Sequence, residues 1–201
     1  MFTTRPGYTH HTHLLESVWP HGLISSVALT AAAAGSETVL WLLSQCWSDV
    51  LLVVDAGGAT LAHVTALSGR ANVLCFLAKA QGSTMLAAKD ASGRTPAHCA
   101  AQRGHVDALR VLVEQLGGTD VQNAADGLGR TPAHAAAEHG HIAVLRFLAE
   151  CLGTSALTTV DTKRFTPAHV AAMRGHVGVL QLLGSEQEAL LTAVSADGLT
   201  P

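Results

Sequence analysis

Charged and aromatic residues are both scarce in this 201-residue chain. Asp, Glu, Lys and Arg together supply 13% of it and aromatic residues 4%, whereas 48% of the residues are hydrophobic. A large core built mostly from small side chains can therefore form. The shortage of aromatic residues argues against a stacking platform for single-stranded nucleic acid. The formal net charge of −3 gives no reason to expect nucleic acid or an anionic membrane as the partner.

The cysteines lack the C-x2-C spacing of a metal site, and each falls in or beside an expected helix: Cys46, Cys75, Cys99 and Cys151. We interpret them as small residues in a reducing compartment rather than as disulfide partners. A basic-then-apolar secretory start is also absent, so we expect a cytoplasmic or nuclear protein that is not secreted. The apolar stretch 22–43 has about the length of a membrane span, but serines, Glu37 and Thr38 interrupt it, and we predict no span.

Sequence signatures of catalysis are missing as well. The chain contains no G-x-x-x-x-G-K-[ST] phosphate loop, no G-x-S-x-G turn and no H-E-x-x-H zinc motif. We therefore predict that the protein is not an enzyme and that it needs no cofactor and no metal.

What the chain does contain is a recurring unit, clearest at residues 126–153, DGLGRTPAHAAAEHGHIAVLRFLAECLG. Glycines in its first four residues suit a turn. Thr131 can cap a helix, and Pro132 suits the first helical position. Gly140 suits the end of that helix, and an apolar periodicity from Ile142 predicts a second helix. Two such short helices cannot bury their apolar faces alone, so the unit needs copies of itself beside it.

The copies are present at residues 90–118 and 161–187, with a weaker one at 55–82. The glycines that end the first helix lie 35, 36 and 35 residues apart, at Gly69, Gly104, Gly140 and Gly175. With its recurring Thr-Pro-Ala-His and Gly-His, the chain resembles the ankyrin-repeat family, whose signature is T-P-L-H-x-A over a period of about 33 residues. The resemblance implies an all-α solenoid of stacked helix-turn-helix repeats, with short β-hairpin fingers projecting between them.

The repeat frame divides the whole chain. We predict a disordered, His-containing leader at 1–21, a degenerate first repeat at 22–54, four repeats at 55–89, 90–125, 126–160 and 161–194, and the start of a sixth at 195–201. In the first repeat Ser26 stands at the threonine position and Val27 replaces proline. The leader, with Trp19 as the plug, is expected to cover the apolar end of the stack, unless that end is a docking surface. Metal or haem capture by its histidines is a weaker alternative.

The resemblance also implies what the recurring polar residues do. In the family, the threonine and histidine of the motif hydrogen-bond each other and the neighbouring backbone, which ties one finger to the next. A catalytic role is disfavoured because an active site needs one constellation and not a copy in every repeat. The frame positions are Thr60, His63, Thr95, Pro96, His98, Gly104, Thr131, Pro132, His134, Gly140, Thr166, Pro167, His169 and Gly175. His105, His141 and His176 receive the same structural interpretation, and we expect the array to loosen below about pH 6 as imidazoles charge.

Function must then lie where the repeats differ. In the family, finger tips and the exposed end of the first helix line a concave groove, which here assigns to a partner Arg94, Gln102, Arg103, Leu128, Arg130, Glu138, His139, Lys163, Phe165, Met173 and Arg174. Several basic side chains with apolar anchors between them favour an acidic, partly hydrophobic peptide over a merely solvated surface. Arg164 departs from the frame, because the other repeats carry glycine there and a side chain strains the turn.

We therefore predict a monomeric, non-enzymatic module that binds another protein or an extended peptide, and neither nucleic acid nor a membrane. The alternative is a regulatory or targeting array of a larger protein, with a catalytic or channel domain beyond residue 201. The unfinished sixth repeat leads us to expect that the natural chain continues.

Overall fold

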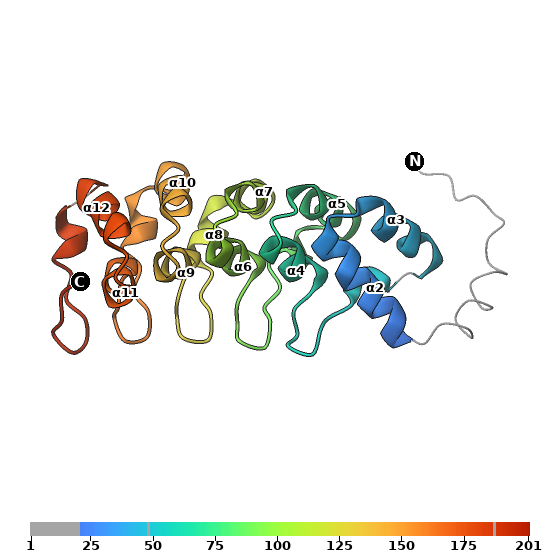
Figure 1. Cartoon of the computed structure of the whole chain (residues 1–201), viewed down its shortest axis with the longest axis horizontal. Coiled ribbons are helices and arrows are strands. Elements are labelled where there is room, and N and C mark those ends of the chain that lie inside the picture. Colours follow the sequence, from blue (N-terminus) through green and yellow to red (C-terminus); the bar gives the residue numbers. More distant parts are fainter. Residues whose placement is uncertain (1–20, 48, 187) are drawn as a thin grey trace.

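Two rows of helices and one row of loops make up an elongated solenoid (Figure 1). The computed structural model describes residues 21–47, 49–186 and 188–201. In each repeat an inner helix lies next to the finger loops, and an outer helix returns antiparallel to it. Inner helices pack on inner helices along the stack, and outer helices on outer helices. The fingers line up along one edge of the molecule.

The inner helices are α2 (His21–Ala34), α4 (Leu61–Leu67), α6 (Pro96–Arg103), α9 (Pro132–Glu138) and α11 (Pro167–Arg174). The outer helices are α3 (Glu37–Cys46), α5 (Ala71–Gln81), α7 (Val106–Leu116), α10 (Ile142–Leu152) and α12 (Val177–Glu186). Short helices fill the exits of the repeats: η1 (Val50–Leu52), η2 (Ser83–Met85), α8 (Gly118–Asn123), η3 (Thr154–Leu157) and η4 (Glu188–Leu191).

The core runs through the whole stack as one apolar cluster. Outer helices contribute leucines at matching positions, and Leu74, Leu109 and Leu145 are each fully buried. Inner helices contribute alanines such as Ala101 and Ala137, also fully buried, and these small side chains let neighbouring helices approach closely. The high alanine content of the chain is thus the composition that tight helix stacking requires.

The fingers differ from the β-hairpins that the family resemblance implies. The described part of the chain contains no strand, and its one isolated bridge joins Val54 and Thr60. Each finger is instead a tight loop organised by its first residue. In the finger of repeat 4, Asp126 Oδ1 accepts the backbone N–H groups of Leu128 and Arg130 at 2.8 and 2.9 Å, and one backbone bond, Asp126 N–H to Arg130 O, closes the loop at 2.9 Å. The aspartate carboxylate takes the place of a ladder of backbone bonds.

The first repeat departs from the expected frame. Its inner helix α2 begins at His21, several residues before Ser26, and runs through both Ser26 and Val27 without a break. Neither the capping threonine nor the helix-starting proline is present at these two positions, so no signal at Ser26 and Val27 starts a new helix. The helix therefore includes His21, which the sequence assigned to the leader. The remainder of that leader, with its histidines and Trp19, lies outside the described residues.

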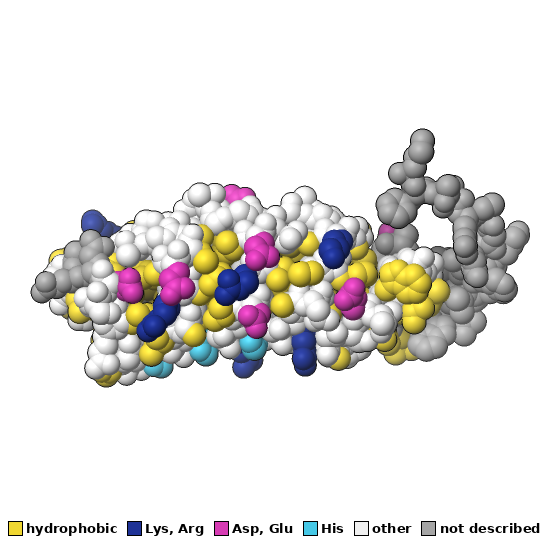
Figure 2. Space-filling model, turned by 90° about the horizontal axis from the view of Figure 1, so that it is seen from above, with side chains coloured by type: hydrophobic (Ala, Val, Ile, Leu, Met, Phe, Trp, Pro, Cys, Tyr) yellow, Lys and Arg dark blue, Asp and Glu magenta, His cyan; other side chains and the backbone are white. Residues whose placement is uncertain are grey.

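Apolar side chains remain exposed at the N-terminal end of the stack. Leu23, Val27, Trp41 and Leu42 are all exposed on the first repeat, and Figure 2 shows hydrophobic atoms gathered at this end, next to the grey ones. The same view shows acidic and basic side chains mixed over the outer helices, with neither sign forming a patch. The outer face thus carries no dominant charge that would attract a highly charged partner.

At the other end, residues 195–201 form a finger that docks on repeat 5. The backbone N–H of Ser195 donates to Leu199 O at 2.9 Å, which closes the loop as in the other fingers. His169 Nε2 lies 2.9 Å from the same carbonyl oxygen. Residues 195–201 therefore form a loop that is closed and held like the preceding fingers.

Candidate functional site

The recurring threonine and histidine form a capping box at the start of each inner helix from α4 on. In repeat 3, the backbone N–H of Thr95 donates to His98 Nδ1 at 3.1 Å, and Thr95 Oγ1 lies 3.0 Å from the same nitrogen. An acceptor at Nδ1 means that the neutral imidazole carries its proton on Nε2. That N–H donates to Arg130 O of the next finger at 2.8 Å. One side chain thus caps its own helix and holds the following repeat.

The same link joins each repeat to the next. His63 bonds to Arg94 O at 2.8 Å and His134 to Phe165 O at 2.9 Å. Burial, the largest influence, lowers the pKa of His63, His98 and His134 and outweighs the opposing effect of their bonds to backbone carbonyls. Both ring nitrogens of these imidazoles have partners, one within the cap and one in the following finger.

The Gly-His turns form a second ladder between repeats. His141 Nε2 bonds to Gln102 O of the preceding repeat at 2.9 Å, and its ring lies over Gly104. A Cβ added to Gly104 would come within 2.7 Å of His141 Nδ1. Gly104 is also left-handed, with φ +78°, so backbone conformation and packing both require glycine at this turn.

The concave side of repeats 4 and 5 contains a pocket of about 400 Å³. It lies between two fingers and the inner helices α9 and α11, and it brings together most of the predicted partner-binding residues. Its lining consists of Leu128, Arg130, Glu138, Asp161, Thr162, Lys163, Phe165, Val170, Met173 and Arg174. We call this hollow the concave pocket.

A smaller hollow of about 70 Å³ continues the concave surface toward the N-terminus. It collects predicted residues of the preceding repeats, namely Arg94, Gln102, Arg130, Glu138 and His139. Arg103 lines neither hollow and is exposed to solvent. The residues that the sequence grouped as one surface therefore line two hollows that share Arg130 and Glu138, with Arg103 outside both.

Ion pairs compensate much of the positive charge that the sequence assigned to this groove. Arg94 contacts Asp90 at 2.8 Å, and Arg130 contacts Asp126 and Glu138, each at 3.1 Å. These carboxylates belong to the loop frame and to α9, and sequence reasoning counted the arginines as free because it could not place their partners.

Glu138 is the centre of this network. Its second carboxylate oxygen binds Arg174 of the next repeat, so it bridges Arg130 and Arg174 across the concave pocket. Its side chain is 19% exposed, against 31% for Arg130 and 58% for Arg174. Glu138 therefore positions the two arginines in addition to lining the pocket.

The frame aspartates are fixed as anions. Burial is the largest single influence on Asp90 and Asp126 and by itself would raise their pKa. Hydrogen bonds from backbone amides and from the arginine four residues later together outweigh burial, so the pKa of both carboxyls is lowered. The finger loops consequently keep their negative charge and their arginine contacts at neutral pH.

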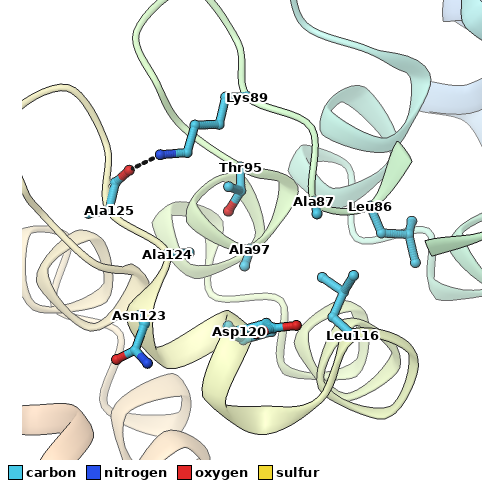
Figure 3. A pocket seen from close by; sticks show the side chains of 11 residues that line it. Leu86, Ala87, Lys89, Thr95, Ala97, Leu116, Asp120, Asn123, Ala124 and Ala125 are labelled. Atoms are coloured by element: carbon cyan, nitrogen blue, oxygen red, sulfur yellow. Dashed lines mark hydrogen bonds between the residues drawn. The ribbon is translucent and has the colours of Figure 1, made fainter. Parts of the chain in front are cut away.

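A second large pocket lies at the exits of repeats 2 and 3, and sequence reasoning missed it (Figure 3). It measures about 340 Å³ and is mainly apolar. Lys89 Nζ donates to Ala125 O across it at 2.8 Å (Figure 3). Its lining is Leu86, Ala87, Lys89, Thr95, Ala97, Leu116, Asp120, Val121, Asn123, Ala124 and Ala125.

The repeat length is the signal that could have revealed this pocket. The corresponding space between repeats 3 and 4, lined in part by Thr131, Ala133 and Leu152, measures only about 10 Å³. Repeat 3 has one residue more than its neighbours and carries the pair Gly117–Gly118 where repeat 4 has Gly153 alone. The extra residues of the repeats thus go into the exits, and in repeat 3 they form the helix α8.

The described residues show no other constellation with a clear chemical role. They contain no cluster of three or more His, Cys, Asp or Glu side chains able to hold a metal ion. None of the described helices has both the length and the apolar character needed to cross a bilayer. Burial raises the pKa of Cys99 to about 11, so this thiol stays protonated at neutral pH.

Stacked helix pairs, capping-box histidines and Gly-His turns define a repeat solenoid. Comparison with protein-family models agrees: a model described as ankyrin repeats in three copies matches residues 28–125 and 116–195. The chain belongs to the ankyrin-repeat family. Arrays of this family are generally protein–protein interaction modules and typically non-enzymatic scaffolds. Among curated proteins no match was found.

Proposed function

We propose that this array binds an extended segment of a partner protein in the concave pocket between repeats 4 and 5, and that the segment is acidic with apolar anchor residues. The observation that carries the proposal is the lining of the pocket, where apolar and basic side chains alternate over the fingers and inner helices of two repeats. The same proposal includes a monomeric array located in the cytoplasm or nucleus. These two parts rest on the sequence alone.

The apolar component is unusually exposed for side chains of this size. Leu128 is 56% exposed and Met173 62% exposed, and Phe165 lines the same pocket. Covering such side chains removes apolar surface from water, which is favourable by roughly 25 cal/mol per Å² before the costs of association. Leucine, methionine and phenylalanine around one hollow suit a leucine or aromatic side chain of the partner.

The polar component favours an acidic partner. Lys163 lines the pocket and forms no ion pair with any described residue. Arg174 is more than half exposed and shares Glu138 with Arg130. A carboxylate entering the pocket meets Arg130 and Arg174, which pair with Asp126 and Glu138, and also Lys163, which has no ion pair with a described residue. Electrostatic complementarity of this kind sets specificity and association rate more than raw affinity.

A peptide-display selection from a random library tests the proposal although the partner is unidentified. Peptides selected on the wild-type array should carry acidic residues next to leucine or an aromatic residue. Their binding should weaken in Leu128→Ala, which removes an exposed anchor of the pocket. The matched control is Leu52→Ala, because Leu52 is 58% exposed and lies on η1, far along the chain from the pocket. Selection of basic peptides, or equal effects of the two substitutions, would refute the proposal.

A further inference from the structure

Arg164 occupies a backbone conformation that the other fingers reserve for glycine. The equivalent residues are Gly58, Gly93, Gly129 and Gly198, with φ between +74° and +77°. Arg164 has φ +60° and is the only residue other than glycine with positive φ in the described chain. A side chain in this left-handed region is disfavoured by contact between its Cβ and the backbone. Glycine therefore suits this backbone conformation better than arginine does, yet the finger of repeat 5 carries arginine.

The position is also crowded by the next finger. A Cβ added to Gly58, Gly93 or Gly129 would lie 3.2, 2.7 or 3.1 Å from a backbone nitrogen of the following finger. By the same frame, the Cβ of Arg164 faces the backbone nitrogen of Ala196. The bond across that junction, Ala196 N–H to Lys163 O, is 3.2 Å long, whereas its three counterparts are 2.9 to 3.0 Å. The arginine is thus accommodated at some cost to the contact between fingers.

The charge of Arg164 is available to a ligand. Both Lys163 and Arg164 are exposed, and neither forms an ion pair with a described residue, including Asp161 and Asp197. One oxygen of Asp161 accepts the backbone N–H groups of Lys163 and Phe165, each at 2.8 Å. In contrast, the arginines deeper in the groove are already paired with carboxylates. Among the fingers, positive charge without an ion pair is therefore concentrated at this finger tip, where Lys163 lines the concave pocket and Arg164 follows it in the chain, outside the lining.

We propose that Arg164 determines the specificity of the array: together with Lys163 it binds the acidic group of the partner segment whose apolar side chains contact Leu128, Phe165 and Met173. This proposal rests on the proposed function. An unpaired guanidinium can bind a carboxylate through two parallel hydrogen bonds without first giving up an internal partner. Strained backbone that persists in a folded protein is concentrated at functional positions. Here the function that offsets the strain is the binding of an anion by Arg164.

The test distinguishes an effect on stability from an effect on binding, because Arg164→Gly should raise the stability of the fold and weaken the binding of an acidic peptide. Arg164→Gly restores the residue of the frame, so its melting temperature should rise while its affinity for an acidic peptide falls by about tenfold. Arg164→Lys keeps the charge and the strained backbone, so melting temperature and most of the affinity should be retained. Arg146→Ala, on the outer helix α10, is the control for the loss of one exposed positive charge.

The probes are a fluorescein-labelled peptide with glutamates flanking a leucine and a phenylalanine, and its counterpart with glutamine in place of each glutamate. Fluorescence anisotropy should show that Arg164→Gly weakens binding of the glutamate peptide and leaves that of the glutamine peptide unchanged. If the wild-type array fails to bind the glutamate peptide, the proposed function is refuted together with this inference. If it binds and Arg164→Gly binds equally well, only the role of Arg164 is refuted. A lower melting temperature in Arg164→Gly would refute the strain argument.

Discussion

Acidification should unfold this array through its buried capping histidines. In the neutral form, Nδ1 of His98 accepts the backbone N–H of Thr95 while Nε2 donates to Arg130 O. Protonation gives the ring a second N–H, located on Nδ1. Nδ1 can then no longer accept a hydrogen bond, so the buried backbone N–H of Thr95 loses its partner. His63 and His134 have the same arrangement. Charging these rings therefore breaks the cap of the helix and also charges a desolvated group.

The sign of the pH effect follows from the lowered pKa of His63, His98 and His134. Between the native pKa and the unfolded value of about 6.5, the unfolded chain binds protons that the native state does not bind, so stability falls as pH falls. Each such histidine contributes at most about 1.4 kcal/mol per pH unit, and three contribute at most about 4 kcal/mol per unit. The aspartates with lowered pKa act only below about pH 4, outside this window.

Urea unfolding followed by circular dichroism between about pH 7.5 and pH 5 measures this slope. His98→Gln supplies the residue that usually occupies this position of a capping box and does not titrate. It loses the link to the next finger, so its stability should be lower at every pH, but its slope should be shallower by up to about a third. His139→Gln, at an exposed histidine, should keep the wild-type slope. A wild-type stability that stays constant over this pH range would refute the reasoning.

Three further predictions concern packing and are measured by the same unfolding experiment. Leu145→Ala empties a fully buried site and should cost about 2–5 kcal/mol; a loss below about 1 kcal/mol would contradict the close packing of the outer helices. Gly104→Ala should be clearly more destabilising than Gly175→Ala, because both glycines have positive φ but only the first lies against a histidine ring, that of His141. Val121→Leu places one more methylene beside the exit pocket and should stabilise by about 0.8 kcal/mol, whereas destabilisation would mean that the pocket cannot be filled from this position.

The repeat frame was predictable because its determinants are local. Thr131, Pro132 and His134 lie within four residues, and together they set where α9 begins. Gly140 ends the same unit through its own backbone conformation. Since each repeat needs only such signals and a copy of itself on either side, sequence spacing was enough to predict the stack of helix pairs. Where the signals are missing, as at Ser26 and Val27, the inner helix runs through the position without a break.

The electrostatics of the groove depend on distances that no single repeat contains. Arg130 and Arg174 belong to different repeats, and Glu138 pairs with both only because α9 and α11 lie side by side. The charge that a partner meets is therefore a property of the assembled stack. The same holds for the exit pocket, which opens between two repeats because one of them is a residue longer.

The sequence by itself determined the repeat family and the all-α stack of helix pairs, and it predicted a set of side chains for the groove. Only the tertiary structure decided which of those side chains are already paired and which, such as Lys163, remain available. The physical reason is range: caps and turns arise from bonds between residues a few positions apart, whereas ion pairs and pockets arise from side chains that stacking brings together across about 35 residues.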